Sequence, residues 1–136
     1  MNILSKITNE VLHIVFRKAD FIDGRVDIIA PDNFLQCSAL MHEAGKTFRP
    51  HKHLYRTRTY DIIAQESWVI ISGSAMCVFY DIDNKIIETV RLEQGDASFT
   101  LKGGHTFRIL EDNTRIFEFK SAPYEGQAID KEFIDV

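Results

Sequence analysis

The chain has 136 residues, of which 45% are hydrophobic and 26% are charged, the composition of an ordinary soluble globular domain. This length fits one domain, residues 1–136, which can bury a hydrophobic core without disulfides. The formal net charge of −4 argues against a protein that binds nucleic acid, because such a protein would carry a basic stripe.

Short β-forming runs separated by turn residues dominate the first half of the chain. Residues 1–20 are expected to form an N-terminal extension or strand: the run Val11–Phe16 favours a strand, and Ile3–Phe16 offers a helix as the alternative. Further strands are expected at Val26–Ala30, Phe34–Met41 and Thr47–His53. The long, polar and aromatic segment Leu54–Gln65 is expected to be a loop over the mouth of the fold.

The second half of the chain shows the same rhythm more clearly. Strands are expected at Trp68–Ile71, Ala75–Tyr80, Ile86–Leu92, Ala97–Leu101, Thr106–Leu110 and Arg115–Lys120. Gly73, between the first two, is expected to be a hairpin corner, and the tail from Tyr124 is a second helix candidate. Strands that recur about every 8–12 residues predict an all-β sandwich or barrel.

Four residues of metal-ligand type begin or occupy these strands. His51 and His53 form a His-x-His pair, and residues two apart on a strand point to the same face. Glu66 and His105 each begin another strand, and a carboxylate at the start of an apolar strand needs a partner or a metal. The four side chains can therefore converge on one ion. The alternative is a pocket without metal, in which they bind substrate or move protons.

The spacing of glycines around these residues strengthens the metal hypothesis. Five residues separate Gly45 from the His-x-His pair, six residues separate Glu66 from Gly73, and Gly95 and a Gly-Gly turn precede His105. Over residues 45–110 this pattern resembles the two sequence motifs of the cupin superfamily. The chain departs from the family in a longer gap before Glu66, in a turn before His105 that is one residue shorter, and in Leu101 and Ile109, where proline and asparagine are frequent.

This resemblance implies an all-β cupin jelly roll, a double-stranded β-helix, in a single domain. It implies that His51, His53, Glu66 and His105 hold one divalent ion, which would be Fe, Mn, Ni or Zn, with open positions for a substrate. It also implies a homodimer that pairs through sheet edges. The ending Phe117–Tyr124 is similar to the tails of small cupin-fold metalloproteins associated with surface-polysaccharide biosynthesis.

The predicted function is that of a metal-dependent isomerase or epimerase acting on a small polar or sugar-like molecule. Tyr60 is the candidate acid or base, because a phenol near a metal can transfer protons. Arg56 and Arg58 are candidates for binding an anionic substrate at the mouth, and Trp68 for lining the pocket. The alternatives are a non-haem iron dioxygenase and a non-enzymatic binding or sensor module.

Other polar and sulfur-containing residues are assigned no role in the chemistry. His13 and His42 lie on strands without matching partners, and Cys37 and Cys77 each lie in an apolar run typical of buried thiols. The strand that carries Glu118 and Lys120 leaves open whether they face the cavity or solvent. No apolar run approaches the ~20 residues that span a bilayer, and no secretory signal is recognisable, so a cytoplasmic protein with no membrane association is expected.

Overall fold

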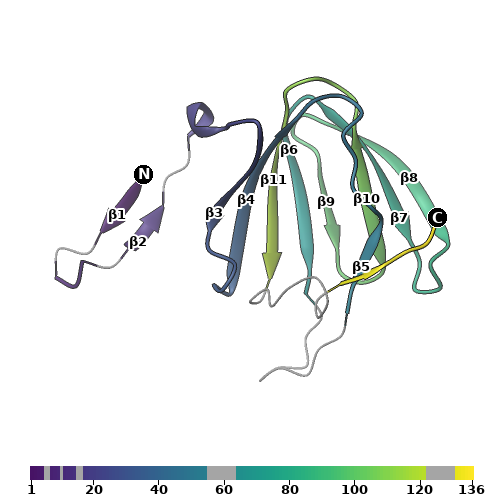
Figure 1. Cartoon of the computed structure of the whole chain (residues 1–136), viewed down its shortest axis with the longest axis horizontal. Coiled ribbons are helices and arrows are strands. Elements are labelled where there is room, and N and C mark those ends of the chain that lie inside the picture. Colours follow the sequence, from purple (N-terminus) through teal and green to yellow (C-terminus); the bar gives the residue numbers. More distant parts are fainter. Residues whose placement is uncertain (5–6, 10, 15–16, 55–63, 122–130) are drawn as a thin grey trace.

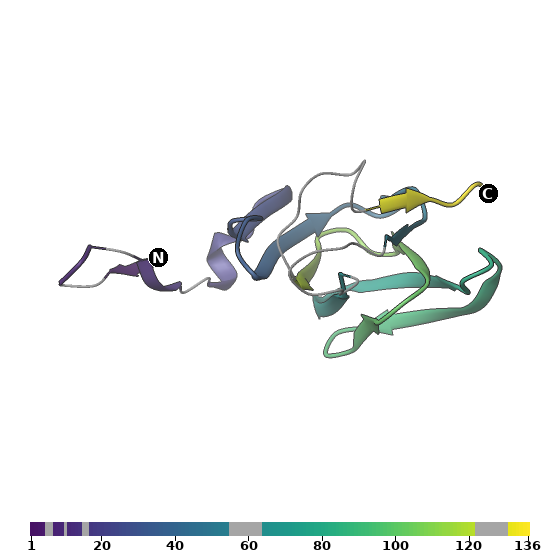
Figure 2. The ribbon, with the colours of Figure 1, turned by 90° about the horizontal axis from the view of Figure 1, so that it is seen from below.

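A computed structural model describes residues 1–4, 7–9, 11–14, 17–54, 64–121 and 131–136. Two five-stranded antiparallel sheets face each other (Figures 1 and 2). The first sheet consists, in order, of β3 (Gly24–Ile29), β4 (Leu35–His42), β11 (Thr114–Ser121), β6 (Glu66–Ser72) and β9 (Ala97–Thr100). The second consists of β12 (Lys131–Phe133), β5 (His51–His53), β10 (Gly104–Ile109), β7 (Ser74–Tyr80) and β8 (Ile86–Glu93).

Alternation along the strands places one set of side chains between the two sheets. Three central strands show the same gradient of inward-facing residues, from a charged or ionisable one at one end to an isoleucine at the other. These series are Glu66–Trp68–Ile70 on β6, His105–Phe107–Ile109 on β10 and Lys120–Glu118–Ile116 on β11. The barrel therefore has one end packed with aliphatic side chains and one end lined with polar groups.

The connections between strands define a jelly roll, as the sequence predicts. The chain crosses from one sheet to the other between β6 and β7 and again at each step from β8 to β11. The prediction that Gly73 is a hairpin corner is wrong, because β6 and β7 belong to different sheets. A turn does occur there, but the chain uses it to change sheets, an outcome that depends on tertiary packing and not on the turn residues.

The two ends of the chain contribute strands where helices were the alternatives. β1 (Asn2–Leu4) pairs with β2 (Val11–Ile14) in a separate hairpin that projects from the barrel (Figures 1 and 2), so the helix over Ile3–Phe16 is wrong. The 3-10 helix η1 (Lys18–Asp20) follows this hairpin. At the other end β12 pairs with β5, whereas residues 124–130 of the second helix candidate lie outside the described part.

Two further expectations can be compared with the described residues. Cys37 and Cys77 are both buried free thiols, as the apolar runs around them predict. Within the described ranges, the structure contains no helix with the length and apolar character needed to cross a membrane.

Gly73 is expected to be less tolerant of substitution than Gly95. Its φ is +80°, and an added Cβ would lie 2.9 Å from the Thr114 Cα. Gly95 is a matched control, with a φ of +91° but no atom within 4 Å of an added Cβ. Gly95→Ala should lower the free energy of unfolding by about 1–3 kcal/mol through backbone strain. Gly73→Ala should lower it by about 1–3 kcal/mol more through overpacking.

Urea unfolding of the metal-free protein, monitored by circular dichroism, measures both losses. Equal losses for the two variants would show that the Thr114 backbone moves aside without cost.

Candidate metal centre

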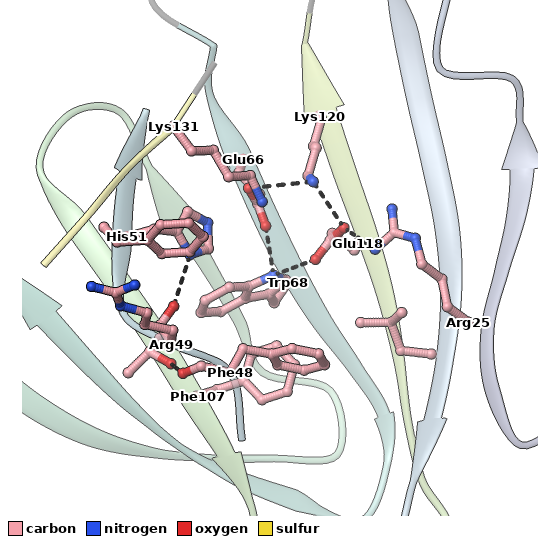
Figure 3. Close-up of a pocket in the computed structure, with 13 residues that line it drawn as sticks. Arg25, Phe48, Arg49, His51, Glu66, Trp68, Phe107, Glu118, Lys120 and Lys131 are labelled. Carbon is pink, nitrogen blue, oxygen red and sulfur yellow. Dashed lines mark hydrogen bonds and ion pairs between the residues drawn. The ribbon is translucent and has the colours of Figure 1, made fainter. Parts of the chain in front are cut away.

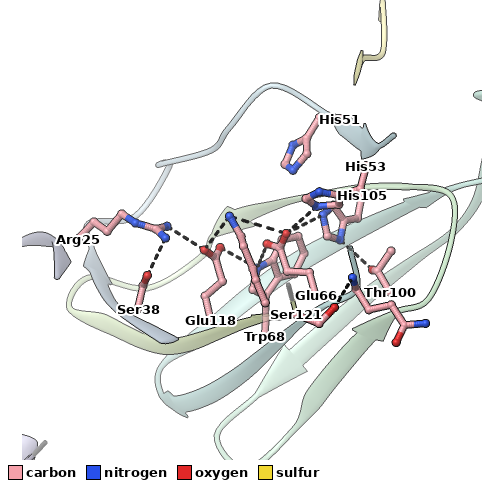
Figure 4. A network of polar contacts seen from close by, with 12 residues as sticks. Arg25, Ser38, His51, His53, Glu66, Trp68, Thr100, His105, Glu118 and Ser121 are labelled. Carbon is pink, nitrogen blue, oxygen red and sulfur yellow. Dashed lines mark hydrogen bonds and ion pairs between the residues drawn. The ribbon is translucent and has the colours of Figure 1, made fainter. Parts of the chain in front are cut away.

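Four side chains from three strands meet at the polar end of the barrel (Figure 4). β5 supplies His51 and His53, β10 supplies His105 directly opposite His51 in the strand register, and β6 supplies Glu66 from the facing sheet. The ring centroids of the three imidazoles are 5.0–5.7 Å apart. The four ligand-type atoms all lie within 4.8 Å of one another, and all four residues are buried.

Hydrogen bonds behind the rings determine which nitrogen atoms face the centre. His51 Nδ1 lies 3.2 Å from the Arg49 carbonyl oxygen, and a carbonyl oxygen only accepts, so Nδ1 carries the proton and Nε2 keeps its lone pair. His105 Nδ1 lies 2.7 Å from Thr100 Oγ1. Among the described residues, the buried Nε2 atoms of His51 and His105 have no hydrogen-bond partner. Buried ring nitrogens without a partner are what an ion at the centre would satisfy.

The protonation states of His51 and Glu66 match those of metal ligands. Burial, with the nearby charges of Lys131 and His105, lowers the pKa of His51 from 6.5 to about 3, so the ring is neutral at physiological pH. Burial by itself would raise the pKa of Glu66. The neighbouring His105, His53 and Lys120 outweigh burial and hold that pKa well below its usual range. Neutral imidazoles and an ionised carboxylate are the forms that bind metal.

The dimensions of the cluster fit one divalent ion. Glu66 Oε2 lies 2.8 Å from His53 Nε2 and 3.6 Å from His105 Nε2. Because nitrogen and oxygen ligands lie about 2.0–2.2 Å from such an ion, two ligand atoms can be at most about 4.0–4.4 Å apart. The widest pair in the cluster is within 4.8 Å, so side-chain adjustments of about half an ångström would close it around an ion.

A cavity of about 260 Å³ opens beside the cluster and is partly lined by His51 and Glu66 (Figure 3). Its other walls are mixed in character: aromatic at Phe48, Trp68, Phe107 and Phe133, basic at Arg25, Arg49, Lys120 and Lys131, and otherwise Leu40, Thr106 and Glu118. An ion in the cluster would therefore be accessible to a small molecule in the cavity.

Trp68 joins the two carboxylates of this cavity. Its indole N–H lies 3.0 Å from Glu66 Oε1 and 3.1 Å from Glu118 Oε2, and donates to both (Figure 3). Glu118 also accepts from Arg25 at 2.8 Å and lies 3.4 Å from Lys120 Nζ. Glu118 and Lys120 thus face the cavity, which decides the orientation that the sequence left open.

Only some of the remaining predicted site residues lie in the described part of the chain. Trp68 lies in the cavity wall, and its contact with a substrate stays a prediction. Tyr60, Arg56 and Arg58 lie outside the described residues, and their roles stay predictions. His42 does not join the cluster; it packs edge-on against Phe48 at 5.7 Å between ring centroids.

Several cavity residues were not expected from the sequence. Arg25 and Lys131 lie far from the cupin-like motifs in the chain, and no local pattern marks either one. The sequence could have indicated that Glu118 faces inward. It lies two residues from Ile116 on the same face of the strand, and Ile116 is completely buried.

Neither a protein-family model nor a curated protein matches the chain. Among solved structures, CapF from Staphylococcus aureus, described as a capsular polysaccharide assembling protein, matches with a TM-score of 0.63 at 16% identity, over 98% of this chain and 37% of that one. An uncharacterized conserved protein with a double-stranded beta-helix domain from Klebsiella pneumoniae matches with a TM-score of 0.62 at 14% identity, over 90% and 97% of the two chains. A cupin-2 domain containing protein from Shewanella frigidimarina matches with a TM-score of 0.52 at 17% identity, over 76% and 86%.

At these identities the comparisons establish the fold alone. The chain has the double-stranded β-helix fold of the cupins, which confirms the fold predicted from the motifs. It spans only about a third of CapF, 37% of that chain, so the fold it shares with CapF is one part of a larger protein.

The low pKa of His51 leads to a prediction about acid behaviour. In metal-free folded protein, NMR should show that His51 stays neutral from pH 8 down to about 4, because its pKa is about 3. In urea the same ring should titrate near the ordinary value of 6.5. Since only the unfolded chain takes up this proton, His51 should make the free energy of unfolding fall as the pH drops from 6.5 toward 3. A folded-state midpoint near 6.5 would contradict the burial argument.

Proposed function

We propose that this cupin-fold chain is a metalloenzyme that binds one divalent ion through His51, His53, Glu66 and His105 and isomerises or epimerises a small, sugar-like molecule. The observation that carries the proposal is the convergence of three imidazoles and one carboxylate, with ligand atoms within 4.8 Å of one another. The cluster is buried and still adjoins a cavity, so four protein ligands would leave one or two positions of a six-coordinate ion for substrate.

The bound ion would supply a Lewis acid that polarises a carbonyl or hydroxyl oxygen. The chain's own residues would orient the centre and handle protons. Arg49 and Thr100 set the imidazole orientations, and Trp68 holds Glu66 in place. Among the described cavity residues that are not proposed ligands, Glu118, Lys120 and Lys131 have groups able to hold or transfer a proton, and Tyr60 remains the predicted acid or base.

Two observations support an assignment to surface-polysaccharide metabolism. The ending Phe117–Tyr124 is similar to small cupin-fold proteins of that setting. CapF, which matches nearly the whole chain in fold, is described as a capsular polysaccharide assembling protein. We also propose that the chain forms a homodimer through its sheet edges, which light scattering coupled to size-exclusion chromatography would test.

Deuterium exchange tests the reaction type. In the proton-transfer route proposed here an isomerase or epimerase removes a proton from carbon, so metal-loaded protein incubated in D₂O with a panel of monosaccharides should introduce deuterium into one of them, as seen by NMR. Iron-dependent oxygen uptake without exchange would instead establish the dioxygenase alternative. Binding without either reaction would establish a binding or sensor module.

Elemental analysis tests the metal site itself. Protein purified without a metal-chelating tag should contain about one divalent ion per chain. The double variant His51→Ala/His53→Ala should lose that ion and stay folded by circular dichroism, since the aliphatic end of the barrel is untouched. His42→Ala is the matched control, because this histidine lies outside the cluster and should keep the ion. Equal metal content in the double variant and the control would refute the ligand assignment.

Thr100→Val tests the hydrogen bond behind His105. Valine keeps the shape of the side chain but removes the oxygen that lies 2.7 Å from His105 Nδ1. Loss of such an orienting partner should weaken metal binding about 10- to 100-fold in a competition titration with a chelator. Thr89→Val on exposed β8 serves as the control and should leave the affinity unchanged. Equal affinities would mean that packing alone orients His105.

A further inference from the structure

The cavity has a charge opposite to that of the whole protein. Its lining contains four basic residues, Arg25, Arg49, Lys120 and Lys131, and two carboxylates, Glu66 and Glu118. This is a formal surplus of two positive charges in a chain whose net charge is −4. Since a divalent ion on the proposed ligands would add to the surplus, an empty cavity would concentrate positive charge in a partly desolvated space.

The two lysines are the cations best placed to bind a ligand. Lys120 comes from β11 of the first sheet and Lys131 from β12 of the second, and Figure 3 shows both at the Glu66 end of the cavity. The Lys120 side chain is only 12% exposed and lies 4.0 Å from Glu66 Oε2. Burial, and then repulsion from Lys120, lowers the pKa of Lys131. An anion bound by both ammonium groups would relieve this repulsion.

Arg25 is engaged by residues of its own sheet. Its guanidinium bonds Asp27, Ser38 and Glu118, each at 2.6–2.8 Å. Glu118 therefore pairs with Arg25 on one side and with Lys120 on the other. Lys120 and Lys131 lie at the Glu66 end of the cavity, so a ligand there meets two ammonium groups beside the metal cluster.

The size and the walls of the cavity restrict the ligand further. A volume of about 260 Å³ lies just below the ~300 Å³ at which pockets for drug-sized ligands begin, so the space suits one sugar ring and not a nucleotide sugar. Phe48, Phe107 and Phe133 provide apolar surface that fits the C–H face of such a ring.

We propose that the cavity binds an anionic, monosaccharide-sized molecule whose carboxylate or phosphate group is held by Lys120 and Lys131. This inference rests on the proposed function, since it places the rest of the molecule against the metal cluster. It narrows the substrate class from a sugar-like molecule to a sugar acid or sugar phosphate. It also assigns the anion to residues from opposite sheets, so the site forms only when the barrel is closed.

Trp68 provides the measurement, because it is the single tryptophan of the chain and lies in the cavity wall. Metal-loaded protein would be titrated with D-galacturonate, D-galactose 1-phosphate and neutral D-galactose while tryptophan fluorescence is recorded. At least one anionic probe should bind about 10-fold or more tightly than galactose, as expected for hydrogen bonds to a charged group. The comparison of the two anionic probes distinguishes a carboxylate from a phosphate.

Variants identify the residues that hold the anion. Lys131→Gln and Lys120→Gln should each weaken binding of the preferred anionic probe about 10-fold and leave galactose binding unchanged. Lys85→Gln is the matched control, because that side chain is 83% exposed and pairs with Asp83. Metal content is measured for each variant, and two independent lysine variants protect the test against misfolding of one.

The possible failures separate the two proposals. Wild-type protein that holds no metal would contradict the proposed function. Protein that holds its ion but binds galactose as well as both anionic probes, or binds none of the three, would overturn the anion site alone. Anion binding that is unaffected in both lysine variants would also overturn it.

Discussion

The structure of the site depends on one buried charge, the carboxylate of Glu66. A carboxylate between two packed sheets is tolerated only if strong partners replace water. Here the partners come from both sheets: Trp68 on the same strand, Lys120 on the neighbouring strand, and His53 and His105 from the facing sheet. Glu66 thereby couples closure of the barrel to assembly of the cluster, and an ion at its centre would complete this compensation.

The gradient along β6, β10 and β11 explains how one small barrel can be both stable and functional. The aliphatic end, with Ile70, Ile109 and Ile116 all buried at 1% exposure or less, provides the hydrophobic burial that such a domain needs. The polar end contributes little to that burial. It contains the cavity, the proposed metal cluster and the basic residues. Substitutions among the ligands should accordingly affect chemistry more than folding, a separation that fits a fold able to host many functions.

The charges of the cavity also belong to the polar end of the barrel. Four basic residues of an acidic chain line one cavity, so the formal charge of this lining is opposite in sign to that of the whole protein. Repulsion from Lys120 contributes to the lowered pKa of Lys131, whereas Glu66 and Glu118 outweigh burial and raise the pKa of Lys120. This arrangement favours an anionic ligand.

The sequence by itself determined the strand rhythm, the four residues of the cluster and the resemblance to cupins, because period-2 alternation, glycine turns and ligand spacing are local properties of the chain. Only the tertiary structure decided that Gly73 leads from one sheet to the other, that Glu118 and Lys120 face inward, and that Arg25 and Lys131 join the cavity. These outcomes depend on which strands pair. Arg25 and Glu118, 93 residues apart, meet only because β4 pairs with both of their strands, a long-range choice that no local pattern encodes.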